Sequence, residues 1–137
     1  MSRNVRLVAL PLAVAIALTA GLMAAFTSRA QSAPSTPRAV LNTFFSSAEH
    51  QDYATTYSCY YQHYHDLVPQ AEFVKHRKQG PKLTAYRIDS LSVHGSTADA
   101  NVTLTFAPAP GSGAAPRTTA THEQMVAEQG GWKIRVW

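Results

Sequence analysis

The apolar residues that follow Thr36 recur at the three- and four-residue spacing of an amphipathic helix. Thr36 is a candidate N-cap, and Pro37 suits the first helical position because a proline there loses no hydrogen bond. The apolar stripe consists of Val40, Leu41, Phe44, Phe45 and Ala48. This pattern predicts a first helix that buries one face.

Two further helices are predicted before the chain reaches residue 81. Asp52 is a candidate N-cap for the second, and tyrosines follow it at steps of four, three and four residues, on one helical face: Tyr53, Tyr57, Tyr60 and Tyr64. Pro69 is placed to open the third helix, Gly80 lies just past its end, and Pro81 prevents its continuation.

The apolar period then changes to two, which predicts β-strands. A two-residue loop at Gly95-Ser96 would pair Val93 with Ala98 and Leu91 with Ala100. Both pairs then place their apolar side chains on one face, so the residue pattern and the turn agree.

Further upstream in the same strand the apolar parity changes. Tyr86 and Ile88 have even numbers, whereas Leu91 has an odd one. A one-residue slip of this kind needs an extra residue, so we expect a β-bulge near Asp89 and Ser90.

A second hairpin is predicted at the carboxyl end, with strands over residues 117–129 and 132–137 and a turn at Gly130-Gly131. In that register Met125 lies opposite Val136. Helices followed by four antiparallel strands indicate an α+β fold.

The order of these elements resembles the nuclear transport factor 2-like superfamily, which has a cystatin-like fold. The resemblance rests on three stretches, Pro37–Tyr57, Ala71–His76 and Ile88–Phe106, and on the ending Gly130-Gly131-Trp132-Lys133-Ile134. It covers about residues 36–137, and the chain closely resembles small exported members of unknown function. It implies N-terminal helices packed on a strongly bent sheet of about four strands, shaped as a cone. Because members include isomerases, dehydratases, transport adaptors and accessory domains of membrane proteins, the resemblance does not fix a function.

The amino-terminal 30 residues have the features of an export signal. Arg3 and Arg6 precede the uncharged run Leu7–Phe26, and small residues flank Arg29 in the motif Ser28-Arg29-Ala30, where cleavage would leave Gln31 first. The run is also long enough to stay as a membrane anchor. Both outcomes place the rest of the chain outside the cytoplasm, secreted or periplasmic if cleaved and membrane-anchored if not. We therefore divide the chain into residues 1–30, a signal peptide or signal anchor, 31–36, a linker, and 37–137, the α+β domain.

Composition excludes several classes of protein. The formal charge of the chain is +4, but from Gln31 onward nine basic residues face eight acidic ones, which does not suit a nucleic-acid-binding domain. Cys59 is the only cysteine, so an internal disulfide or a multi-cysteine zinc site is excluded.

The cluster His63-Tyr64-His65-Asp66 has residue types that bind metals. On a helix, however, the two histidines would point about 200° apart, since each residue turns about 100°. We interpret the cluster as a solvated helix end, and we expect no metal site and no cofactor.

A ligand pocket is the more specific hypothesis. Tyrosines of the second helix and inward-facing residues of the third strand would line it: Tyr57, Tyr61, Tyr64, Glu123 and Met125. The same tyrosines would equally serve as a helix face packed on the sheet. A carboxylate in a half-apolar cavity can act as a general base, which makes Glu123 a catalytic candidate, with Asp89 second. We nevertheless expect that Glu123 is not a catalytic base and that the domain has no catalytic residue.

The leading functional hypothesis is a non-catalytic accessory module that binds an unidentified protein or a small apolar ligand. The module would present its open sheet face, with Val126 and Trp137, to a partner, and a homodimer through the sheet is a further arrangement. The competing hypothesis is an isomerase or dehydratase that uses Glu123 or Asp89. An open cavity with a buried carboxylate and a histidine or tyrosine within hydrogen-bond reach of it favours the enzyme, and a cavity filled by tyrosine and phenylalanine rings favours the module.

Overall fold

The computed structural model describes residues 36–136. Four helices are followed by four strands: α1 (Pro37–Glu49), α2 (Tyr53–Ser58), α3 (Gln62–Leu67), α4 (Gln70–Gln79), β1 (Leu83–His94), β2 (Thr97–Phe106), β3 (Arg117–Glu128) and β4 (Gly131–Arg135). The predicted export segment lies outside the described residues. Within residues 36–136, no helix is long and apolar enough to cross a membrane.

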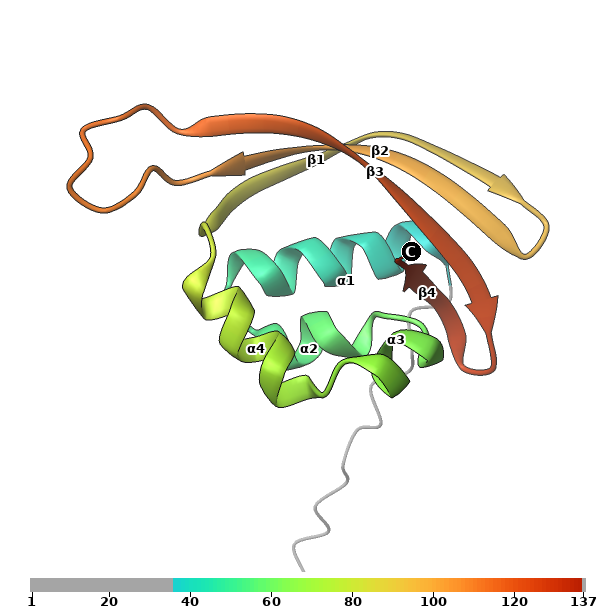
Figure 1. Cartoon of the computed structure of the whole chain (residues 1–137). Coiled ribbons are helices and arrows are strands. Elements are labelled where there is room, and N and C mark those ends of the chain that lie inside the picture. The colour runs from blue at the N-terminus through green and yellow to red at the C-terminus, as the bar shows by residue number, and fades with distance from the viewer. Residues whose placement is uncertain (1–35, 137) are drawn as a thin grey trace, which may run out of the picture. The chain divides into compact units, whose positions relative to one another are not determined.

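The strands form one antiparallel sheet in the order β1-β2-β3-β4. The sheet curves over α1, and the helices lie on one side of it (Figure 1). The α+β fold predicted from the residue pattern is therefore confirmed, and the sheet has one face toward the helices and one open face.

Both predicted N-caps are confirmed, and the helix predicted to open at Pro69 is α4, which begins at Gln70. The hydroxyl of Thr36 accepts a hydrogen bond of 3.2 Å from the amide of Ala39, and the carboxylate of Asp52 accepts one of 3.2 Å from the amide of Thr55. Each bond satisfies an amide that has no partner within its own helix.

The tyrosine-rich segment forms two short helices rather than one. After α2 ends at Ser58, the chain pairs with β4: the amide of Ile134 donates to the carbonyl of Cys59 at 2.8 Å, and the amide of Tyr61 donates to the carbonyl of Ile134 at 3.0 Å. α3 begins only after this pairing. The rings nevertheless stay together, since those of Tyr60 and Tyr64 have centroids 4.4 Å apart.

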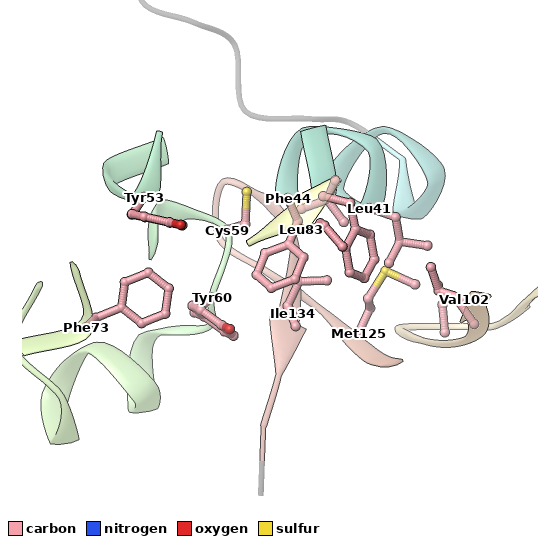
Figure 2. Packing of buried hydrophobic residues seen from close by; sticks show 14 residues of the cluster. Leu41, Phe44, Tyr53, Cys59, Tyr60, Phe73, Leu83, Val102, Met125 and Ile134 are labelled. Atoms are coloured by element: carbon pink, nitrogen blue, oxygen red, sulfur yellow. The ribbon is translucent and has the colours of Figure 1, made fainter. Parts of the chain in front are cut away.

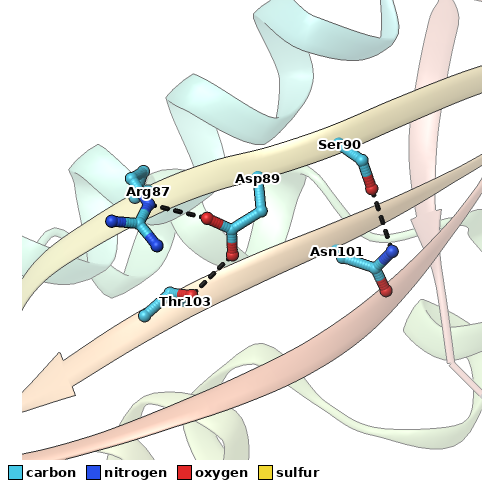
Figure 3. A network of polar contacts seen from close by, with 5 residues as sticks. All are labelled: Arg87, Asp89, Ser90, Asn101 and Thr103. Atoms are coloured by element: carbon cyan, nitrogen blue, oxygen red, sulfur yellow. Dashed lines mark hydrogen bonds and ion pairs between the residues drawn. The ribbon is translucent and has the colours of Figure 1, made fainter.

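The first hairpin has the predicted register. Val93 pairs with Ala98 and Leu91 with Ala100, and the register shifts between Ile88 and Ser90, which confirms the bulge. Polar side chains bond across this irregularity on the open face of the sheet (Figure 3). Among them, the amide of Asn101 donates to the hydroxyl of Ser90 at 2.9 Å.

The register predicted for the last hairpin is wrong by two residues. Met125 pairs with Ile134 rather than Val136, and the strands join through Gln129 and Gly130. Gly130 has a φ of 108°, a conformation that favours glycine. Because a two-residue shift preserves parity, Met125 and Ile134 still face the helices.

The core lies between α1 and the middle of the sheet. Leu41 and Phe44 of α1 pack toward Val102, Met125 and Ile134, one from each of the three strands β2, β3 and β4 (Figure 2). Four of these five residues are at most 1% exposed, and Phe44 is 5% exposed. At the far end of the first hairpin, Val93 is 53% exposed although it has core-facing parity, so the hairpin extends beyond the helices that would cover it.

Candidate functional site

A cavity of about 640 Å³ opens between the inner face of the sheet and the helices. Pockets for small ligands usually have volumes of about 300–1,000 Å³. Most of its lining is apolar or aromatic and comes from α1, the segment 53–60, the α4–β1 connection, the first residue of β1, β2 and the residue after β4. These residues are Phe44, Phe45, Ala48, Tyr53, Tyr60, Gly80, Pro81, Leu83, Leu104, Phe106 and Val136. Five polar side chains complete it: His76, Arg77, Arg117, Thr121 and Glu123.

Glu123 is the acidic group of the cavity. Its carboxylate accepts a hydrogen bond of 2.9 Å from the hydroxyl of Thr121, two residues away on the same face of β3. Burial raises the pKa of Glu123, and the Thr121 hydrogen bond and the positive charge of Arg77 offset part of this rise. The prediction from parity that this side chain faces the helices is confirmed.

Arg77 reaches the cavity from α4 and is fixed by two aromatic side chains. Its guanidinium donates a hydrogen bond of 3.2 Å to the hydroxyl of Tyr60 and lies 5.3 Å from the ring centroid of Phe73. Tyr60 is 4% exposed, and burial raises its pKa to about 12. The tyrosine therefore stays protonated at neutral pH and presents a neutral hydroxyl.

A second guanidinium lines the cavity at the start of β3. Arg117 lies over the ring of Phe106, 5.7 Å from the centroid, and the two residues are also paired across the β2–β3 ladder. A cation over an aromatic face is held by the ring quadrupole, so Arg117 has a preferred position although it is exposed.

Of the five residues predicted to form a pocket, only Glu123 lines this cavity. The hydroxyls of Tyr57 and Tyr61 donate to the backbone carbonyls of Val68 and Val136, at 2.6 Å and 2.8 Å. Met125 is 1% exposed in the core, and Tyr64 lines a separate hollow between α3 and α4. The structure thus uses these tyrosines to tie segments together and does not gather the predicted set in one site.

The sequence pattern did not identify the two arginines of the cavity. Arg77 lies in a basic run that reads equally well as the solvated end of a helix. Arg117 has the same odd parity along β3 as Thr121 and Glu123, and this parity was the signal that could have identified it.

The other chemical candidates lie elsewhere. Asp89 is on the open face of the sheet, where it bonds with Thr103 and Arg87 (Figure 3), so it cannot serve chemistry inside the cavity. His65 bonds through its ring to the carbonyl of Tyr57 at 2.9 Å. Among residues 36–136, no group of three His, Cys, Asp or Glu side chains is placed to hold a metal ion.

The open face of the sheet, the predicted partner surface, is polar. His122 lies 3.2 Å from both Asp99 and Asn101. Val126 is half-buried here, and Trp137 lies outside the described residues.

The chain matches no protein-family model and no curated protein. Its structure is similar to a SEC-C motif-containing protein from Rhodopseudomonas palustris, with a TM-score of 0.63 and 17% sequence identity over 77% of this chain and 79% of that one. A protein from Thiobacillus denitrificans, named for the association domain of calcium/calmodulin-dependent protein kinase type II, has a TM-score of 0.58 and 13% identity over 73% and 90%. A SEC-C motif-containing protein from Psychrobacter arcticus has a TM-score of 0.60 and 10% identity over 74% and 59%. At these identities the similarities show a shared fold and nothing about activity.

Proposed function

We propose that the domain is a non-catalytic binding module that takes a small, largely apolar ligand into the cavity under the sheet. The observation that carries this proposal is the cavity itself, with its volume of about 640 Å³ and its mainly apolar lining. Ligand pockets combine an apolar lining with a few polar groups that orient the ligand. Here Glu123, Arg77 and Arg117 are those groups.

The hydrogen bonds and pKa values of the polar side chains in the cavity favour a binding function over a catalytic one. The carboxylate of Glu123 is engaged by Thr121, and the hydroxyl of Tyr60 is engaged by Arg77 and has a pKa of about 12. His76 lines the cavity, and none of the described residues forms a hydrogen bond with its ring. General acid–base catalysis needs a group with a pKa near the working pH and a fixed orientation.

The proposal is tested by filling the cavity. Ala48 lines it from α1, so Ala48→Leu should weaken binding of a neutral fluorescent probe, N-phenylnaphthylamine, by about tenfold or more while the domain still folds. Ala54→Leu, on the exposed side of α2, adds the same atoms away from the cavity and is the matched control. If both variants and the natural protein bind the probe with equal affinity, the cavity is not the binding site of the probe.

One observation favours the competing enzyme hypothesis. Glu123 lines the cavity, and burial raises its pKa, which is how enzymes prepare a carboxyl group for proton transfer. Glu123→Gln keeps the shape and removes the charge. If the protein isomerises or dehydrates a small molecule and this variant loses the activity while it stays folded, the enzyme hypothesis replaces ours.

The proposed place of action is outside the cytoplasm. The uncharged run Leu7–Phe26, with Arg3 and Arg6 before it, supports export by a cleaved signal or an uncleaved anchor. Protease added to intact cells, with the outer membrane permeabilised where there is one, should digest the domain. Protection until the cells are lysed would refute export.

The relation to the nuclear transport factor 2-like superfamily, with its cone-shaped fold, is also a proposal. The order of helices before strands and the curvature of the sheet over α1 support it. Profile searches with newly sequenced homologues would test it, since true members should link this chain to the superfamily in sequence.

A further inference from the structure

Cationic groups outnumber acidic ones around the cavity. Arg77 and Arg117 line it together with His76, whereas Glu123 is the only acidic side chain in its lining. Even with His76 neutral and Glu123 ionised, the lining carries one positive charge in excess. A ligand with a negative group would balance this charge.

The positive charges of the two arginines are compensated to different degrees. Arg77 is close enough to Glu123 for its charge to affect that carboxyl group, so part of its charge is already compensated. Arg117 contacts the ring of Phe106, and no described residue forms an ion pair or a hydrogen bond with its guanidinium. Its N–H groups therefore remain able to donate to an anion, in the paired geometry that suits a carboxylate.

The polar groups lie at separate places along an apolar surface. Arg117 and Glu123 are six residues apart on β3, which corresponds to about 20 Å of strand. Apolar side chains line the cavity beside this strand, Leu104 and Phe106 from β2 and Phe45 from α1. A ligand that fits this arrangement has one charged end and an apolar body.

We propose that the ligand of the cavity is a small organic anion, an aromatic or aliphatic carboxylic acid, whose carboxylate is bound by Arg117 while its apolar body lies against Phe106, Leu104 and Phe45. This inference rests on the proposed function and specifies its ligand class. An organic cation fits less well, because Glu123 is already bonded by Thr121 and lies in the field of Arg77.

Three probes with the same ring system separate the alternatives: naphthoate, naphthalenemethanol and naphthylmethylammonium, which are anionic, neutral and cationic. They are titrated by calorimetry into protein purified from cells that express the full chain. We expect naphthoate to bind about tenfold more tightly than the alcohol, and the advantage to shrink at about 1 M salt, where the Debye length is about 3 Å. The ammonium probe should bind most weakly.

The variant Arg117→Gln tests whether Arg117 binds the carboxylate of the ligand. It should lower the affinity for naphthoate to that for the alcohol and leave the affinity for the alcohol unchanged, while Arg117→Lys should keep part of the preference for the anion. Arg38→Gln, on the exposed side of α1, makes the same charge change away from the cavity and should have no effect. Thermal melts establish that each variant is folded.

The outcomes distinguish the inference from the function on which it rests. The ligand class would be overturned, and the binding function would stand, in any of three cases. The three probes bind with equal affinity, the ammonium probe binds most tightly, or Arg117→Gln lowers the affinity for all three probes equally. If none of the probes binds, the proposed function fails and the inference fails with it.

Discussion

The backbone of Tyr60 forms a parallel β-bridge with Ile134. The bridge joins the segment between α2 and α3 to β4 through two hydrogen bonds, from the amide of Ile134 to the carbonyl of Cys59 and from the amide of Tyr61 to the carbonyl of Ile134. Tyr60 also presents its ring to the cavity and its hydroxyl to Arg77. The bridge therefore fixes one wall of the candidate site to the sheet.

Ile134→Ala should strongly destabilise the domain. Ile134 is 0% exposed, and removing a buried side chain of this size costs about 2–5 kcal/mol through lost burial and the cavity left behind. Chemical denaturation measures the loss. Val93→Ala, at a side chain that is 53% exposed, is the control and should cost about 0.5 kcal/mol or less. Similar losses at both positions would contradict the packing of β4 described above.

Side-chain parity could be predicted from the sequence because it follows from the period of the strand alone. Parity correctly placed Met125 and Ile134 on the helix side, and the change of parity after Ile88 located the bulge. Register is set by the turn, and two adjacent glycines at 130 and 131 allow more than one turn position, so the pairing of Met125 could not be decided. The break between α2 and α3 also escaped prediction, because it depends on pairing with Ile134, more than 70 residues away.

The candidate site was less predictable than the fold. Glu123 was found because strand parity sets its direction. Arg77 was missed because a cationic residue near the end of a helix is stabilised there by the helix dipole, whether or not it also lines a cavity. Its contacts with Tyr60 and Phe73 depend on how α4 packs against the preceding segment, which local sequence does not encode.

A buried pair of hydroxyls should couple α1 to α2. The hydroxyl oxygens of Ser47 and Thr56 lie 2.7 Å apart, and each also lies within hydrogen-bond distance of a backbone carbonyl, that of Phe44 and that of Asp52. Since each hydroxyl has one proton, one of them donates to the other, which in turn donates to its carbonyl. Ser47→Ala and Thr56→Val should each cost about 0.5–1.5 kcal/mol, and the double variant should cost less than their sum because the shared hydrogen bond is lost only once. Denaturation of the four proteins gives the coupling energy. Strictly additive losses would mean that the two hydroxyls do not interact.

Cys59 should be chemically inert in the folded protein. It is 3% exposed, so a reagent has little access to its sulfur. Burial raises the pKa of its thiol to about 11, so very little of the reactive thiolate is present at neutral pH. Iodoacetamide should label the native protein very slowly and the denatured protein rapidly, as followed by mass spectrometry. The variant Ser92→Cys is the positive control, because it places a thiol on the exposed part of β1. In this variant the labelling rates of the introduced cysteine and of Cys59 can be compared within one molecule. Rapid native labelling of Cys59 would show that this part of the core opens readily.

Glu123 should make the stability of the domain depend on pH. Burial holds the folded-state pKa of Glu123 above its ordinary value of 4.5, so between pH 4.5 and the folded pKa the folded protein binds more protons than the unfolded one. The free energy of unfolding should therefore fall as the pH rises through this window, and the loss should be complete above the folded pKa. Glu123→Gln carries no charge at any pH and can still accept the hydrogen bond from Thr121.

The difference in unfolding free energy between Glu123→Gln and the natural protein should accordingly be small below pH 4.5, grow in favour of the variant as the pH rises, and then level off. Denaturation at a series of pH values measures it, and the pH at which the rise levels off marks the folded pKa of Glu123. Glu72→Gln removes a carboxyl group from the exposed surface of α4 and controls for the change in net charge. A difference that is constant with pH, or that favours the natural protein at neutral pH, would mean that ionised Glu123 is well solvated or firmly paired. In that case the cavity would be more polar than its lining indicates, and an apolar body would not be its preferred occupant.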